Sequence, residues 1–414
     1  MISIKPRSAQ PNEQAMNTNT PSTPDQLADA NTLHWTENEQ ACSARWHSEK
    51  SSSAPKRVIL AVDQLTADTA YRYACAGTAM LWRGDFQNAR QLLQALARRA
   101  DRPSKKSARA AIQPKPMPEA FHLHRLAQSQ RARTLDMLLI PFNADYSIPL
   151  RRAPDVSQAC NEVYGKAGEE GFVISLRELL GLISAHEWRK KGVSINTGES
   201  GIELHIHPHY GVFAPVRGEY VALVADAPLP PALSKKSLAF DIGTGTGVLA
   251  AVLMKRGLKQ VIATEQDARA LSCARDNLNR LYLSDQVDLL ETDLFPPGQA
   301  PLIVCNPPWV PARPSSPIEH AIYDPESRML KGFLSGLAAH LAPGGEGWLI
   351  LSDLAEHLGL RSRAELLEAI DAGGLKVLGR LETKATHAKA SDASDPLYAA
   401  RQAEVTSLWR LAAA

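Results

Sequence analysis

The segment Asp241-Ile242-Gly243-Thr244-Gly245-Thr246-Gly247 decides the fold of this 414-residue chain. It follows the apolar stretch Ser237-Leu238-Ala239-Phe240 and precedes an apolar-rich stretch from Val248 to Lys255. The first stretch predicts a buried strand, and the second predicts a helix. The glycines between them permit positive φ and remove the Cβ atoms that would block a bound ligand. The segment therefore predicts a strand, a ligand-holding turn and a helix in succession.

A second predicted strand, Gln260-Val261-Ile262-Ala263-Thr264, ends in Glu265, 24 residues after Asp241. A carboxylate in this position can accept hydrogen bonds from both hydroxyls of a ribose, which NAD and S-adenosylmethionine (SAM) both contain. The dinucleotide fingerprint G-x-G-x-x-G places its third glycine one residue later than this chain does. Up to Glu265, the pattern leaves an NAD-dependent oxidoreductase, a SAM-dependent enzyme and a purely structural glycine turn as alternatives.

Two more predicted strands favour SAM. Val287 to Glu291 is followed by Asp293, whose carboxylate can accept from an adenine amino group, and Pro301 to Cys305 leads directly into Asn306-Pro307-Pro308-Trp309. Ligands of open parallel sheets bind beyond the carboxyl ends of the strands. We therefore expect four polar groups to lie around one ligand: Asp241, Glu265, Asp293 and Asn306.

The Asn306-Pro307-Pro308-Trp309 corner has the groups needed to hold a planar NH2 group. The side-chain oxygen of Asn306 and the carbonyl of Pro307 can each accept one N–H bond, and Pro308 restricts the backbone. Trp309 can stack on a planar amide or base. Because SAM carries a reactive methyl, alignment of donor and acceptor is the main requirement, and no strong base is needed. The corner predicts methyl transfer to nitrogen; the alternative is a proline-stiffened turn with a buried tryptophan.

Residues from about 200 to 411 resemble the class I SAM-dependent methyltransferases. More narrowly, they are similar to the branch that holds the release-factor glutamine methyltransferases and the small-domain ribosomal RNA guanine-N2 methyltransferases. The resemblance implies that SAM is the cofactor and that Asn306, Pro307 and Trp309 hold the acceptor nitrogen. The cofactor-binding residues that it implies, together with the strand-end reading above, are Asp241, Gly243, Thr244, Gly245, Gly247, Glu265, Asp293 and Asn306.

Two further segments are similar to that branch. Gly211 to Tyr220 matches the hairpin segment G-V-L-I-P-R-P-x-T-E of the glutamine methyltransferases, and Tyr323 to Leu330 matches their E-P-x-x-A-L stretch. The proline-arginine-proline core of the hairpin segment is altered here, and Trp309 replaces the more usual tyrosine. The resemblance covers about half of the chain, and the N-terminal half does not match the helical domain that docks a release factor.

The expected fold class is α/β, with a seven-stranded, doubly wound, Rossmann-like sheet over residues 200–414 that ends in an antiparallel pair, Leu375 to Leu381 and Glu404 to Leu411. Residues 1–55 are polar and without sustained periodicity, so we expect a disordered tail. Residues 56–199 are expected to form a smaller α/β or α+β domain for substrate recognition. It includes a basic, proline-containing linker at 103–118.

Charge is concentrated in one part of the chain. The stretch 83–133 contains twelve Lys or Arg and three Asp or Glu, whereas the whole chain carries a net charge of only +2. Such a stretch can guide a polyanion such as ribosomal RNA, or it can be a solvated linker and helix face. The run His205, His207 and His209 lacks further ligands nearby in the sequence, so we predict no metal site. These histidines are expected to face solvent or to shape the acceptor mouth.

Composition limits the remaining classes. No run approaches the roughly 20 apolar residues that span a bilayer, and the start of the chain lacks a signal-peptide core. The five scattered cysteines fit neither a disulfide framework nor a zinc site, and Cys305 is expected to be a small buried strand residue. We expect a cytoplasmic protein.

Three functions remain open from the sequence. The first is N-methylation of an exocyclic base amine in RNA, which the basic stretch favours. The second is N-methylation of a glutamine side chain in a protein such as a release factor or a ribosomal protein, which the hairpin segment favours. The third, of another class, is a non-catalytic SAM-fold binding protein; the presence of Asp241, Glu265 and Asn306 argues against it.

Overall fold

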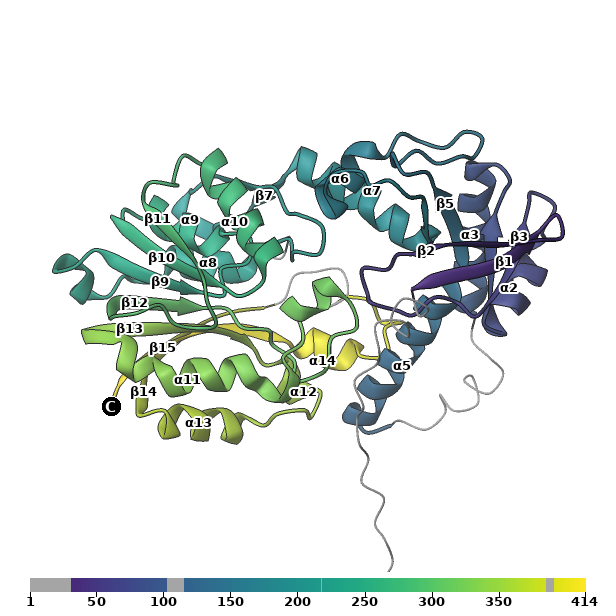
Figure 1. Cartoon of the computed structure of the whole chain (residues 1–414). Helices are drawn as coiled ribbons and strands as arrows, with labels where there is room; N and C mark the ends of the chain where they lie inside the picture. Colours follow the sequence, from purple (N-terminus) through teal and green to yellow (C-terminus); the bar gives the residue numbers. More distant parts are fainter. Residues whose placement is uncertain (1–30, 103–114, 217, 385–390) are drawn as a thin grey trace, which may run out of the picture.

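A computed structural model describes residues 31–102, 115–216, 218–384 and 391–414. Two sheets organise these residues, a seven-stranded one in the C-terminal half and a six-stranded one in the N-terminal half (Figure 1). Each sheet is covered by helices and has its own hydrophobic core. In the described part of the chain, no helix is both long and apolar enough to cross a membrane.

The C-terminal sheet has the strand order β11-β10-β9-β12-β13-β15-β14. Strands β9 to β13 are parallel, and β15 runs antiparallel to both β13 and β14. The strands are β9 (Leu238–Ile242), β10 (Gln260–Glu265), β11 (Val287–Glu291), β12 (Ala300–Cys305), β13 (Leu341–Ser352), β14 (Leu375–Lys384) and β15 (Val405–Ala413). The prediction of a seven-stranded, doubly wound sheet with a final antiparallel pair is confirmed.

Helices pack on both faces of this sheet (Figure 1). One core contains the apolar side of α8 (Glu219–Asp226), nearly all of α9 (Val248–Lys255) and Leu278 of α10 (Ala268–Arg280). The other contains α11 (Arg328–His340) and α13 (Arg363–Ala372). The remaining helical elements of this half are short: α12 (Leu354–His357), α14 (Tyr398–Ala403), η2 (Pro231–Ser234), η3 (Pro317–Ala321) and η4 (Pro325–Ser327). Apolar helices thus cover both faces of the central strands β9 and β12, which are fully buried.

The N-terminal sheet has the order β1-β2-β6-β5-β4-β3. Its strands are β1 (Thr32–Glu37), β2 (Gln40–Trp46), β3 (Arg57–Ala61), β4 (Thr78–Trp82), β5 (Leu138–Phe142) and β6 (Phe172–Ser175). The helices are α2 (Ala67–Cys75), α3 (Phe86–Ala100), α5 (Met117–Leu135), α6 (Ser157–Tyr164) and α7 (Leu176–Lys191). This domain is α/β, one of the two classes that the sequence left open.

The disordered tail predicted for residues 1–55 is wrong for its second part. Residues 1–30 lie outside the described residues, but β1 and β2, which lie in the segment predicted to be disordered, form a hairpin. Leu33 is fully buried and Trp46 is nearly so, and both pack in the same apolar cluster. The alternation of single apolar residues with polar ones in β1 was too short a signal to outweigh the polar composition of this region.

Two other boundaries differ from expectation. The basic linker predicted at 103–118 lies outside the described residues up to 114, and from Met117 the chain is already in α5. The expected domain boundary near residue 200 falls inside a two-stranded sheet, formed by β7 (Val193–Ile195) and β8 (Leu204–Ile206), with the one-turn η1 (Gly198–Ser200) between its strands. Ile195 and Ile206 pack with the C-terminal core, so β7 already belongs to that domain.

Among the residues that the structure describes, three ion pairs connect the two halves. Arg269 in α10 pairs with Glu49 at 2.8 Å, and Arg189 at the end of α7 pairs with Asp276 at 2.8 Å. On another side, Arg125 of α5 pairs with Glu319 at 3.2 Å, and its guanidinium lies 3.9 Å from the centre of the Tyr323 ring. The N-terminal domain is therefore held beside the segments that follow β10 and β12.

Candidate cofactor and acceptor site

The register of three adjacent strands brings the predicted site residues together. Ile242 of β9 pairs with Thr264 of β10 on one side and with Cys305 of β12 on the other. The residues that follow these three, Gly243, Glu265 and Asn306, therefore leave the sheet side by side. This is the edge at which open parallel sheets bind their ligands.

The glycine loop turns over the end of β10. The backbone N–H groups of Gly243 and Thr244 both donate to the carbonyl of Thr264, at 3.0 and 2.9 Å. Gly245 has a φ of +57°, and a Cβ atom added there would meet nothing within 4 Å. The loop thus leaves open space above Gly245, as the methionine part of SAM requires.

Asp241 supports this loop from below. Its carboxylate is 1% exposed and accepts hydrogen bonds from the Thr244 hydroxyl at 2.6 Å and from the Ala250 backbone N–H at 3.0 Å. Burial raises the pKa of Asp241 from 3.8 to about 6, although these two bonds favour the charged form. Asp241 thus joins the loop to the first turn of α9, beneath the expected position of the cofactor.

Glu265 is partly buried beside the same loop. One carboxylate oxygen accepts from the Gly245 backbone N–H at 3.1 Å, and the other accepts from Gln266 and Asp267 at 2.9 and 3.0 Å. Burial raises its pKa, and these backbone bonds oppose the shift. The bonds fix the direction of the carboxylate, and the oxygen that faces Gly245 keeps a lone pair for a hydroxyl group.

Asp293 lies after β11 and is exposed. Both of its oxygens accept from Arg328, at 2.9 and 3.1 Å, and Arg328 also donates to the Gln266 side chain at 3.3 Å. Sequence reasoning missed Arg328 as the partner of Asp293, because 35 residues separate the two. The pair connects the ends of β10 and β11 at the first residue of α11, next to the expected adenine position.

The turn before α11 has unusual backbone geometry. Glu326 and Ser327 have φ values of 57° and 55°, a left-handed conformation that costs energy in residues with a side chain. The buried Asp324 accepts from the backbone N–H groups of Met329 and Leu330, each at 3.1 Å. This turn places the methyl group of Met329 against the Cα of Gly243, where a Cβ atom would approach it to 2.5 Å. Sequence reasoning missed Met329 as a neighbour of the glycine loop.

The acceptor corner contains a bond that the sequence did not predict. The indole Nε1 of Trp309 donates to Oδ1 of Asn306 at 2.9 Å. Trp309 is partly buried and packs against three apolar clusters. Part of the indole is therefore covered by protein, and one lone pair of the Asn306 oxygen already has a donor. The second lone pair remains for an acceptor N–H.

Cys305 and the histidine run have structural roles. Cys305 is fully buried, and burial raises its thiol pKa well above the ordinary value, so it is unsuited to act as a nucleophile.

His205 and His207 contact the carbonyls of Lys191 and Arg189, at 3.0 and 2.6 Å, in the last turn of α7. Such carbonyls lack partners within a helix. Nowhere in the described ranges do three His, Cys, Asp or Glu side chains gather as a metal site.

Much of the basic stretch is occupied by ion pairs within the protein. The described cations in 83–133 that have a carboxylate partner are Arg83, Arg99, Lys115, Arg125 and Arg131. Lys105, Lys106 and Arg109 lie outside the described residues. The paired cations are poorly suited to bind a polyanion, so this stretch supports a nucleic-acid role less than its composition indicated.

Residues 203–363 match the family model described as "Methyltransferase small domain". The chain is 34% identical over 116 residues to a release factor glutamine methyltransferase of Rhodopirellula baltica. It is 31% identical over 148 residues to a tRNA1(Val) (adenine(37)-N6)-methyltransferase of Shewanella loihica. These alignments cover 26% and 33% of this chain, and they span only 37% and 59% of the respective relatives.

Among solved structures, the chain is similar to a ribosomal protein L11 methylase from Lactobacillus delbrueckii subsp. bulgaricus. The sequence identity is 17% and the TM-score is 0.34. The match covers 52% of this chain and 97% of the other.

Proposed function

We propose that this chain, whose residues 203–363 belong to the methyltransferase small-domain family, is an enzyme that methylates a planar NH2 nitrogen with SAM. One observation carries the proposal. Asn306 leaves β12 directly beside the glycine loop, because Cys305 and Ile242 are partners in adjacent strands. This position supports a role for Asn306 in holding an NH2 group beside the proposed cofactor site. When bound there, SAM supplies an electrophilic methyl group on its sulfonium sulfur.

At this edge, some residues contact the cofactor and others hold the acceptor. The open space above Gly245 admits the methionine part of SAM, and Glu265 accepts from the ribose hydroxyls. The second lone pair of the Asn306 oxygen and the carbonyl of Pro307 accept the two N–H bonds of the acceptor. With both hydrogens fixed, the nitrogen lone pair is turned toward the methyl group. Such alignment can supply on the order of 7–11 kcal/mol of the barrier.

We propose an exocyclic base amine in RNA as the acceptor. The relative from Shewanella loihica is named for N6 methylation of an adenine in tRNA, and its alignment includes 33% of this chain. An exocyclic amine is planar because its lone pair is delocalised into the ring. The two acceptors proposed for Asn306 and Pro307 match its two hydrogens.

A glutamine side chain in a protein is the second candidate, and it has support of its own. The relative from Rhodopirellula baltica is named as a release factor glutamine methyltransferase. The segment from Gly211 to Tyr220 is also similar to a segment of that family. In the described structure, the segment from Gly211 to Tyr220 contains no strand. The antiparallel pair of β7 and β8 lies before this segment in the chain. An amide NH2 is also planar, so the same corner can hold it.

The deciding experiment is incubation of the full chain with methyl-labelled SAM and separate fractions of ribosomal RNA, transfer RNA, ribosomal protein and release factor. The proposal predicts label in an RNA fraction, located on an exocyclic amine after digestion and mass spectrometry. Label only in protein would exclude RNA as the acceptor and favour a glutamine side chain. SAM binding without label in any fraction would contradict the enzymatic proposal and favour a non-catalytic binding protein.

A further inference from the structure

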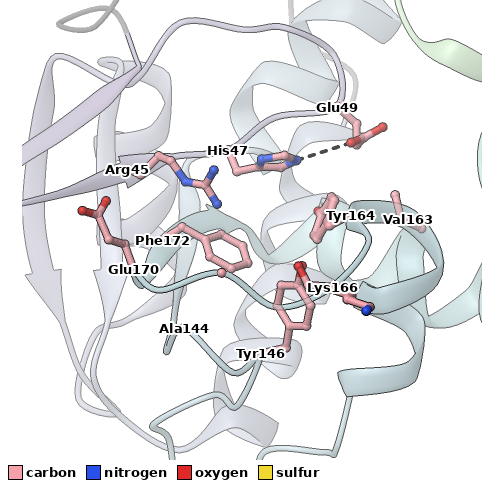
Figure 2. Close-up of a pocket in the computed structure, with 11 residues that line it drawn as sticks. Arg45, His47, Glu49, Ala144, Tyr146, Val163, Tyr164, Lys166, Glu170 and Phe172 are labelled. Carbon is pink, nitrogen blue, oxygen red and sulfur yellow. Dashed lines mark hydrogen bonds and ion pairs between the residues drawn. The ribbon is translucent and has the colours of Figure 1, made fainter.

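A cavity of about 350 Å³ lies in the N-terminal domain, outside the site described above. We call it the aromatic pocket. Figure 2 shows its ring-bearing side chains gathered around one space, with the guanidinium of Arg45 pointing into it. Four rings line it, and they come from positions far apart in the sequence: His47, Tyr146, Tyr164 and Phe172. Its volume is within the range of pockets that bind small ligands.

The rings form walls that meet at steep angles. The rings of Tyr146 and Tyr164 stand at 85° and 90° to that of Phe172, with centroids 6.0 Å from it in both cases. The Tyr146 hydroxyl donates to the Gly165 carbonyl at 3.2 Å, and the Tyr164 hydroxyl lies 3.5 Å from Glu178. These contacts hold the two tyrosines in place. Tyr146 is buried, whereas Tyr164 is partly exposed, so Tyr164 offers the ring surface that a planar guest can reach.

The charges at the pocket favour an anionic guest. Glu49, one of its two carboxylates, is already paired with Arg269 at 2.8 Å and with His47 at 3.3 Å. In the parts of the chain that the structure describes, Arg45 and Lys166 have no carboxylate partner, and the guanidinium carbon of Arg45 lies 5.4 Å from the centre of the Phe172 ring. Arg45 can bind a phosphate through two nitrogens. The other acidic lining residue, Glu170, is exposed at the rim.

The pocket lies on the side of the domain that faces the cofactor site. Glu49 pairs with Arg269, which lies in the first turn of α10, and Asp267 immediately before that helix donates its backbone N–H to Glu265. Arg269 also lies over the ring of Tyr210, 5.6 Å from its centroid, and Tyr210 packs against the N-terminal core. The aromatic pocket is therefore connected to Glu265, the carboxylate proposed to bind the ribose, through Glu49, Arg269 and the start of α10.

We propose that the aromatic pocket binds one unpaired nucleotide of the RNA acceptor, with its base against the ring of Tyr164 and its phosphate at Arg45. The inference rests on the proposed function with RNA as the acceptor. Proteins that recognise single-stranded RNA stack splayed bases on aromatic side chains and contact the phosphates with cations. The pocket supplies both groups, and the basic stretch 83–133 does not.

The test is direct binding of a fluorescein-labelled, single-stranded RNA ten-mer of mixed sequence to the full chain, followed by anisotropy at several salt concentrations. Arg45→Ala should weaken binding at least about fivefold and lower the slope of log affinity against log salt by about one. Tyr164→Ala should weaken binding by about five- to 100-fold, the range for losing one stacked base. Tyr164→Phe, which keeps the ring, should bind as the wild type does.

Lys56→Ala is the matched control. Lys56 is an exposed cation of the same domain, next to β3 at the far edge of the sheet from β1 and β2. If Arg45→Ala and Tyr164→Ala bound the ten-mer as Lys56→Ala does, the aromatic pocket would not be an RNA site. Failure of the wild type to bind the ten-mer would overturn the inference as well. Tyr164→Phe and Arg45→Ala keep the test informative if Tyr164→Ala fails to fold.

The binding measurement needs neither SAM nor turnover, so its failure is separable from failure of the proposed function. Methylated RNA together with unchanged pocket variants would leave the function standing and remove the pocket. If RNA binding depended on the pocket but label appeared only in protein, the pocket would stand as an RNA site and RNA would be excluded as the methyl acceptor.

Discussion

The indole Nε1 of Trp309 donates a hydrogen bond to Oδ1 of Asn306 across 2.9 Å. An amide side chain can rotate by 180° and exchange its oxygen and nitrogen, and a single N–H donor is enough to select one orientation. The bond therefore keeps an oxygen, rather than an NH2 group, in the position proposed to hold the acceptor. A tyrosine in this place would offer a hydroxyl at the end of its ring and no N–H at the position of Nε1.

Trp309→Phe tests this bond, because it removes the N–H and keeps an aromatic ring. We expect turnover to fall by about tenfold, the scale of one hydrogen bond, with SAM affinity within a few-fold. Trp309→Ala also removes the ring and should in addition weaken acceptor binding. Steady-state kinetics with calorimetry of SAM binding measure both effects. Wild-type turnover in Trp309→Phe would show that the bond has no role in positioning Asn306.

Gly245→Leu should abolish SAM binding by filling the space above the glycine loop. The control is Gly257→Leu, since Gly257 also has a positive φ and open space at its Cβ but lies between α9 and β10, in the turn that precedes the start of a strand. Both variants carry the backbone strain, so only loss of binding specific to Gly245→Leu reports on the site. Equal SAM affinity of the two variants in calorimetry would refute the placement of the cofactor.

Glu265→Ala should weaken SAM binding by roughly 1–3 kcal/mol, the usual scale for losing hydrogen bonds to a charged group. The variant also removes the acceptor of the Gly245 backbone N–H, so part of the loss comes from the loop. Calorimetry with NADH as a second ligand completes the measurement. Binding of NADH in place of SAM would contradict the identity of the cofactor.

Asp241 gives a pH dependence of stability. Burial raises its pKa from 3.8 to about 6 in the folded protein, so at intermediate pH the folded state holds a proton that the unfolded state releases. The stability from this group is complete below its unfolded pKa and is lost as the pH rises through about 6. Asp241→Asn has no carboxyl group to titrate at this position, so its stability does not fall in this way. The free energy of unfolding of the variant, relative to that of the wild type, should therefore increase as pH rises from about 4 to about 7.

Urea unfolding of both proteins at several pH values measures this difference and cancels the contributions of the other titrating groups. A difference that stays constant with pH, or that grows in favour of the wild type, would show that Asp241 is charged at little cost in the folded state.

The C-terminal half was largely predictable because its central strands, such as β12, are continuous apolar runs that are followed by polar residues. Helix α9 has the predicted bounds, Val248 to Lys255, and the fully buried β12 begins one residue before the predicted Pro301, since buried parallel strands and their helices leave a strong pattern in the sequence. The joint position of Gly243, Glu265 and Asn306 followed from the rule for strand ends.

The contacts made by side chains could not be read from the sequence. The pairing of Arg328 with Asp293 and the bond from Trp309 to Asn306 depend on rotamers and on turns with a left-handed backbone. The helix α5 was also missed. Its apolar residues are too scattered among basic and polar ones to give a clear helical stripe, and only Phe121 and Leu135 are buried.

The central claim is that Asn306 holds the nitrogen that receives the methyl group. The most direct measurement compares the turnover of Asn306→Ala with that of the wild type on the identified acceptor, together with SAM affinity by calorimetry. We predict that turnover falls by about 100-fold or more, the scale for removing one aligned polar group, while SAM affinity stays within a few-fold. Asn306→Asp should also fail, because the charge and the lost amide donor alter the corner. Wild-type turnover in Asn306→Ala would contradict the account and leave the Asn-Pro-Pro-Trp corner as a structural turn.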